Sequence, residues 1–164
     1  MKKIALLTVM AVCAGFSACS DDDVEEPGPG PQRVAIGSYT FDGTEHDICY
    51  GVYDSNDSYY NFLFAPTAQG ETHHTVIMLS IGRYFEGQTM QVTEREANFD
   101  YIFSYDDPFF YYAPEFALKG GTISVKDNGD GNFTVKMEDI VLPNKKSFSL
   151  SFEGTLPNVY DTVQ

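Results

Sequence analysis

A ten-residue segment from Tyr105 to Pro114 concentrates the side chains that could recognise a ligand. It reads Tyr-Asp-Asp-Pro-Phe-Phe-Tyr-Tyr-Ala-Pro, so two carboxylates stand beside five aromatic rings. Aromatic rings stack on the apolar faces of sugars, while carboxylates accept hydrogen bonds from sugar hydroxyls. The segment breaks strand alternation and carries two prolines, which predicts a loop. The candidate ligand-binding residues are Tyr105, Asp106, Asp107, Phe109, Phe110, Tyr111 and Tyr112.

Alternatively, the same segment has a structural role and packs against the hydrophobic core. Phe109, Phe110 and Tyr112 could fold back and plug one end of a β-core. Tyr59 and Tyr60 would extend a binding surface only if their strand begins at the same end of the sheet. The topology decides between these arrangements.

The stretch from Asp127 to Gly131 has the composition of a calcium loop but not its spacing. If Gly131 takes the place of the EF-hand glycine, Lys126 falls at the first ligand position and Met137 at the last. Neither side chain suits calcium. A hairpin turn is the better interpretation, because Asn-Gly and Asp-Gly supply the positive φ angles that such turns require.

The three histidines do not form a predicted metal site. His73 and His74 are adjacent in sequence, so on entering a strand they would point to opposite faces and would rarely share one ion. His46 stands alone beside Asp47. We expect all three to be solvent-facing turn residues, and we predict no metal and no cofactor.

Motifs of catalysis are missing from the sequence. It contains no Gly-x-Ser-x-Gly, no His-Glu-x-x-His and no phosphate-cradling glycine loop. A glycosidase needs two carboxylates that face each other across a cleft, and nothing nominates such a pair among the 24 acidic residues. We therefore expect no enzymatic activity, and a small hydrolase is the lowest-ranked alternative.

The first 18 residues have the composition of a secretory signal peptide. Lys2 and Lys3 precede thirteen mostly apolar residues, Ile4 to Phe16, which are too few to span a bilayer. The small residues Ser17 and Ala18 then lead to Cys19. One alternative is an ordinary signal peptide that is cut near Ala18.

The sequence Phe16-Ser17-Ala18-Cys19 resembles the lipobox of bacterial lipoproteins, and Ser20-Asp21-Asp22-Asp23 resembles the acidic export signal of surface lipoproteins in Bacteroidota. The resemblance implies that Cys19 becomes the new N-terminus and carries fatty acyl chains such as palmitate. It also implies an outer-membrane protein that is lipid-anchored and exposed at the cell surface. The alternative is that the acidic residues simply solvate a linker.

Residues 19–32 form a predicted tether between the lipid and the domain. Proline and glycine alternate from Pro27 to Pro31, which removes backbone donors and prevents a stable helix. Thirteen residues from Ser20 to Gln32 could extend to roughly 40 Å in a polyproline-like state. Residues 33–164 remain for one folded domain.

Charge and cysteine content limit the partners of that domain. After removal of the signal peptide with Lys2 and Lys3, the rest of the chain, tether included, has eight Lys and Arg against 24 Asp and Glu, a net charge of −16. Such a charge argues against binding nucleic acid, or an anionic membrane, through the folded part. Because Cys13 leaves with the signal peptide and Cys19 is acylated, only Cys49 remains, and it is expected to be a small buried hydrophobic residue.

The domain has the alternating pattern of an all-β protein. β-branched and aromatic residues alternate with polar ones, and no segment shows a sustained helical repeat, so the strands should be antiparallel. The sequence leaves open a two-sheet sandwich or a flattened barrel of about eight to ten strands. Strands are predicted near residues 35–41, 48–53, 59–64, 75–81, 89–94, 99–105, 122–126, 133–137 and 148–154.

The last third of the chain carries a second resemblance. The turns and strands of Gly121–Val125, Asp127–Val135 and Ser149–Leu156 resemble the closing hairpins of small Bacteroidota lipoproteins, some of which are calycin-like. This implies an all-β fold and no particular function. Lipocalin-type calycins usually open with Gly-x-Trp, whereas this chain has Gly37-Ser38-Tyr39 and no tryptophan.

Three functions from different classes follow. The first is a non-catalytic surface lipoprotein that binds a glycan or another extracellular ligand, as an accessory to outer-membrane uptake. The second is a structural lipoprotein that interacts with another envelope protein. A long unprotected edge strand would favour this function. The third is the small hydrolase. Separately, Asp161-Thr162-Val163 matches the O-glycosylation motif of Bacteroidota, which makes Thr162 a candidate glycosylation site.

The lipid anchor is testable by substitution. Cys19→Ser should abolish membrane retention and leave the domain folded, because each buried acyl methylene contributes about 0.8 kcal/mol and several chains together anchor almost irreversibly. Metabolic labelling with a fatty-acid analogue measures this. Undiminished labelling of the Cys19→Ser protein would remove the lipoprotein interpretation.

Overall fold

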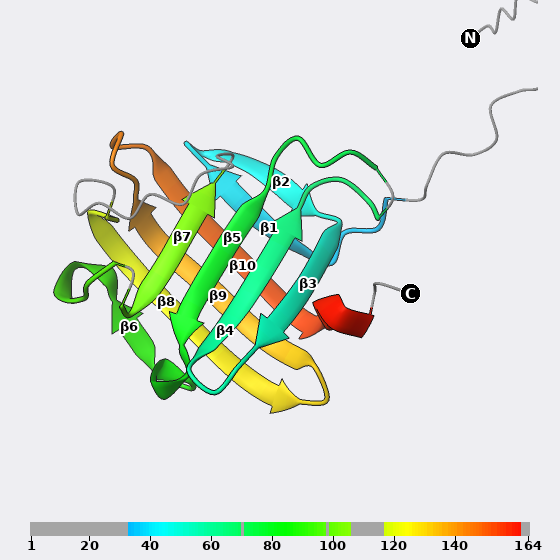
Figure 1. Cartoon of the computed structure of the whole chain (residues 1–164). Helices are drawn as coiled ribbons and strands as arrows, with labels where there is room; N and C mark the ends of the chain where they lie inside the picture. Colours follow the sequence, from blue (N-terminus) through cyan, green and yellow to red (C-terminus); the bar gives the residue numbers. More distant parts are fainter. Residues whose placement is uncertain (1–32, 70, 98, 106–116, 162–164) are drawn as a thin grey trace, which may run out of the picture. The chain divides into compact units, whose positions relative to one another are not determined.

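The computed structural model describes residues 33–69, 71–97, 99–105 and 117–161 as two antiparallel β-sheets that pack face to face (Figure 1). The predicted signal peptide, Cys19, the export signal and the tether lie outside the described residues, as do Thr162 and most of the aromatic segment. Within the described ranges, no helix is both long enough and apolar enough to cross a membrane.

The larger sheet has six strands in the order β2-β1-β10-β9-β8-β6, and the smaller has four in the order β3-β4-β5-β7. In the larger sheet, β1 spans Gly37–Phe41, β2 Thr44–Ile48, β6 Thr89–Gln91, β8 Gly120–Gly129, β9 Asn132–Val141 and β10 Ser147–Thr155. In the smaller, β3 spans Tyr50–Ser55, β4 Tyr59–Ala65, β5 Ile77–Gly82 and β7 Tyr101–Tyr105. Short 3₁₀ turns lie at η1 (Arg83–Phe85), η2 (Val92–Glu94) and η4 (Val159–Asp161).

Both predicted hairpin turns are confirmed. Asp130 and Gly131 join β8 to β9 with φ of 53° and 72°, the left-handed geometry of a two-residue turn. Between β3 and β4, Asn56 Oδ1 accepts hydrogen bonds from the backbone N–H groups of Ser58 and Tyr59, at 2.8 and 2.9 Å. These hydrogen bonds to the Asn56 side chain satisfy backbone N–H groups in the turn, where pairing between the strands stops.

Strand β2 was not predicted from the sequence. The expected strand at 48–53 is instead the end of β2 and most of β3, which belong to different sheets. Because β2 consists mostly of polar residues, it lacks the apolar alternation by which strands were predicted. The turn before it is nevertheless recognisable, because Asp42-Gly43 is a preferred two-residue hairpin turn and has φ of 50° and 82°. The strand expected at 89–94 is also shorter, since η2 replaces its second half.

Aromatic side chains fill the space between the sheets. Phe133 of β9 lies 5.2 Å from Phe62 of β4 between ring centroids, and Phe64 lies 5.2 Å from Phe152 of β10. Residues from both sheets form one buried cluster. The all-β expectation is confirmed, and of the two architectures left open the described strands have that of a sandwich, with no closed barrel.

Phe133 offers a test of this core. Its side chain is 1% exposed and contacts the rings of Tyr53, Tyr60 and Phe62, so Phe133→Ala should lower the free energy of unfolding by about 3–5 kcal/mol. Urea melts measure the loss. Phe99→Ala is the matched control, because Phe99 is 69% exposed and should change stability by less than about 0.5 kcal/mol. Equal losses in the two variants would contradict the packing described here.

Candidate functional site

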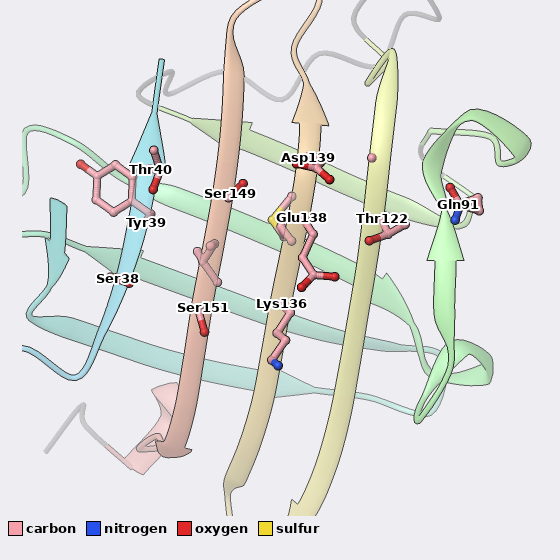
Figure 2. Close-up of a pocket in the computed structure, with 13 residues that line it drawn as sticks. Ser38, Tyr39, Thr40, Gln91, Thr122, Lys136, Glu138, Asp139, Ser149 and Ser151 are labelled. Atoms are coloured by element: carbon pink, nitrogen blue, oxygen red, sulfur yellow. The ribbon is translucent and has the colours of Figure 1, made fainter. Parts of the chain in front are cut away.

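A groove of about 770 Å³ crosses the outer face of the six-stranded sheet, the face turned away from the four-stranded sheet. Figure 2 shows its side chains rising from four neighbouring strands, β1, β10, β9 and β8, with Gln91 from β6 at one side. The polar lining side chains are Ser38, Thr40, Gln91, Thr122, Lys136, Glu138, Asp139, Ser149 and Ser151.

Strand pairing places these side chains in rows across the sheet. Ser38 of β1 lies opposite Ser151 of β10, and Ser151 lies opposite Lys136 of β9. Because side chains alternate along each strand, the residues between them point inward. Tyr39, Leu150 and Met137 are accordingly buried in the core. The outer face therefore carries short hydroxyl side chains, which leave the groove open.

A β-bulge in β9 brings two carboxylates onto this face. The pairing of β10 with β9 shifts between Phe148 and Leu150, so Ser149 stands opposite both Glu138 and Asp139. Both acidic residues are exposed, and Asp139 has a φ of 52°. A left-handed conformation is uncommon for a residue other than glycine, and Asp tolerates it better than most. One extra residue thus breaks the alternation and puts consecutive carboxylates on one side.

Gly121 of β8 makes room for the bulge. It has a φ of 99°, and a Cβ there would lie 2.6 Å from the Glu138 carbonyl oxygen and 2.7 Å from that of Asp139. No side chain fits at that distance. Backbone conformation and close approach therefore both require glycine at this position.

The charged groups of the groove are available to a ligand. In the described part of the chain, ion pairs join Arg33 to Glu71 and Lys146 to Asp42, and neither involves the groove. Lys136, Glu138 and Asp139 have no side-chain hydrogen bond or ion pair there. The groove thus offers one ammonium donor, Lys136, and two carboxylate acceptors, Glu138 and Asp139, among hydroxyl groups that can donate or accept hydrogen bonds.

A second hollow, of about 280 Å³, lies on the outer face of the four-stranded sheet. Its lining includes Asn61, Ser80 and the apolar Met78 and Ile102. The Ser80 hydroxyl donates to Asn61 Oδ1 at 2.6 Å, so two of its polar groups are already paired with each other. The larger groove is the better candidate for a polar ligand.

Of the predicted aromatic segment, the structure describes Tyr105 alone. Its ring is half-buried and stacks on Phe41 with 4.6 Å between centroids, beside the core residue Phe148. Asp106, Asp107, Phe109, Phe110, Tyr111 and Tyr112 lie outside the described residues. Tyr59 and Tyr105 lie at opposite ends of the four-stranded sheet, because β4 and β7 run in the same direction and Tyr59 begins β4 whereas Tyr105 ends β7.

Two of the histidines differ from the expected turn residues. His46 lies within β2 and stacks on Tyr39, and His73 stacks on Tyr50 and shares a hydrogen bond with Thr67. Both are half-buried, and His74 is exposed as expected. No group of three or more His, Cys, Asp or Glu among the residues described could hold a metal ion.

Cys49 connects β2 to β3 and is half-buried, so it is neither inside a strand nor fully buried as expected. Partial burial, together with the nearby negative charge of Asp47, raises the pKa of the thiol above its usual value of 9.0. The neutral thiol is therefore favoured near neutral pH. This environment disfavours a reactive thiolate.

None of the groove residues was singled out by the sequence analysis. Each is a common surface residue, and they come from five strands, of which β1 and β6 are distant in the chain from the consecutive strands β8, β9 and β10. One local signal was available: Glu138 and Asp139 interrupt the alternation of apolar residues between Met137 and Ile140. Two consecutive polar residues at such a point indicate a bulge.

The chain was compared with protein-family models, with curated proteins and with solved structures, and none of them matches it.

The bulge can be tested with two glycine substitutions. Gly121 and Gly129 have φ of 99° and 91°, but a Cβ at Gly129 would meet nothing within 4 Å. Gly129→Ala should cost only the left-handed backbone conformation, about 1–2 kcal/mol. Gly121→Ala should cost about 1–3 kcal/mol more, because the methyl group collides with the backbone of β9. Denaturant melts that give the same stability for both variants would contradict the close approach.

Proposed function

We propose that this chain is a cell-envelope lipoprotein whose β domain binds an extracellular ligand without transforming it, and that the ligand is a glycan. The observation that carries the proposal is the open polar groove with unpaired Lys136, Glu138 and Asp139 among hydroxyl side chains. The lipobox and acidic signal around Cys19 support a lipid anchor in the outer membrane and exposure at the cell surface. A role as an accessory to an uptake system fits this placement.

The lining of the groove favours a ligand rich in hydroxyl groups. Serine and threonine hydroxyls donate and accept, so they complement sugar hydroxyls in either role. Hydrogen bonds to the charged groups of Lys136 and Glu138 are stronger than those between neutral groups. The chain without its predicted signal peptide has a net charge of −16, which opposes a polyanionic ligand, so a neutral saccharide fits better than an acidic one.

The alternatives find less support in the same geometry. The two carboxylates of the groove are neighbours on one strand, whereas a glycosidase needs a pair on opposite sides of the scissile bond. Strand addition needs a long unprotected edge. The edge strand β2 has five residues, of which Glu45 and Asp47 are exposed and charged, and β6 at the other edge of the sheet has three.

A glycan array probed with the lipidated chain in detergent tests the proposal, followed by calorimetric titration of any glycan retained. Lys136→Met and Glu138→Gln should each weaken binding by about tenfold or more, because each removes a charge-assisted hydrogen bond. Thermal stability should hardly change, since both side chains are exposed.

Two matched variants serve as controls. Lys126→Met and Glu153→Gln remove the same charges from exposed positions on neighbouring stretches of β8 and β10, outside the groove. They should bind as the unchanged chain does. Equal affinity in the groove variants and the controls would overturn the assignment of the groove, and release of sugar from the array would overturn the non-catalytic role.

A further inference from the structure

An exposed tyrosine ring is held in place at the end of β5. Tyr84 lies in η1 and is 59% exposed. Its ring occupies the space beside Gly82, because a Cβ at residue 82 would lie 2.4 Å from Tyr84 Cε1 and 2.9 Å from Cδ1. On another side it packs against Phe85, with 4.2 Å between ring centroids. The absence of a side chain at Gly82 therefore lets the ring rest on the backbone.

The hydroxyl of Tyr84 is also fixed. It donates a hydrogen bond to Asp100 Oδ1, and the backbone N–H of Gly82 donates to the Asp100 carbonyl at 3.0 Å. Partial burial of the hydroxyl and the adjacent carboxylate raise the pKa of Tyr84 to about 12. The hydroxyl thus remains a donor at neutral pH, and little conformational entropy is left for the ring to lose on binding.

Two further aromatic residues gather at the same place. Phe99, the neighbour of Asp100, is 69% exposed, and its carbonyl accepts a hydrogen bond from the Tyr59 hydroxyl at 2.9 Å. Hydrogen bonds to the consecutive residues Phe99 and Asp100 therefore tie Tyr59 of β4 and Tyr84 of η1 to the segment before β7. We call Tyr59, Tyr84, Phe99 and Asp100 the aromatic platform.

The carboxylate of Asp100 has acceptor capacity left. Oδ1 accepts from Tyr84 and Oδ2 accepts from the backbone N–H of Glu96 at 3.2 Å, which uses two of about four lone-pair positions. A planar ring with an open surface, next to a carboxylate that can accept further hydrogen bonds, matches the apolar face and hydroxyl edge of a pyranose.

We propose that the aromatic platform is a second saccharide-binding site, in which a pyranose ring stacks on Tyr84 and Phe99 and its hydroxyls donate to Asp100. None of its four residues lines the groove. The platform extends the proposed glycan-binding function, because the groove has no exposed aromatic ring and binds through hydrogen bonds alone. Two separated contacts on one chain would raise its avidity for a polysaccharide.

The experiment titrates the full lipidated chain in detergent with cellohexaose, maltohexaose, xylohexaose and mannohexaose, and follows the ring signals of tyrosine and phenylalanine by NMR. At least one hexaose should shift the signals of Tyr84 and Phe99. Tyr84→Ala should weaken its binding about tenfold, because the stacked ring is lost. Tyr84→Phe keeps the ring and should retain affinity to within about threefold.

Two more variants separate a binding role from a purely structural one. Gly82→Ala leaves Tyr84 in the chain but pushes its ring away, so it should weaken binding as Tyr84→Ala does. Tyr160→Ala removes another exposed ring, 73% exposed and outside the platform, and should have no effect.

The outcomes also distinguish the two sites. Loss of hexaose binding in the Lys136 and Glu138 variants but not in Tyr84→Ala would overturn the platform and keep the groove. Loss of hexaose binding in Tyr84→Ala but not in the Lys136 and Glu138 variants would support the platform and overturn the assignment of the groove as a binding site. If no hexaose shifts the signals of Tyr84 and Phe99, the platform proposal is wrong.

Discussion

The contact between aromatic rings of the two sheets is the interaction on which the rest of the structure depends. A β-sheet with one apolar face is stable only when that face is covered. Here the cover is mutual, as Phe62 and Phe64 of β4 meet Phe133 and Phe152 of the opposite sheet. Large flat side chains bury much apolar area per residue and prefer tilted or edge-on contacts, which fixes how the sheets face each other.

Once the inner faces are fixed, the outer faces are fixed as well, because a strand has only two sides. Every apolar residue that points inward on β1, β8, β9 and β10 leaves a polar neighbour pointing outward. The groove is the consequence of this alternation on strands whose outward residues are short. The bulge at Glu138 and Asp139 is a local exception within the groove, and it adds negative charge where alternation alone would have given a single carboxylate.

The two proposed binding surfaces use different physics on the same scaffold. The groove offers hydrogen bonds from exposed strands and lacks an exposed ring, whereas the aromatic platform offers ring faces held by Gly82 and Asp100. Both are built on residues positioned by strands or by turns tied to strands, so neither needs a large rearrangement to present its side chains. The excess of acidic residues disfavours anionic partners at either surface.

The all-β class, the antiparallel hairpins and the turn residues could be predicted from the sequence alone, because period-two alternation and Asp-Gly or Asn-Gly turns are local properties. The sequence did not reveal β2, whose residues are nearly all polar and whose place at the sheet edge depends on pairing with β1. The shared groove of five strands, and the hydrogen bonds that tie Tyr59 to Phe99 and Tyr84 to Asp100, became visible only in the folded structure. The reason is that strand order and register bring together residues far apart in the chain, and neither composition nor local spacing encodes which strands become neighbours.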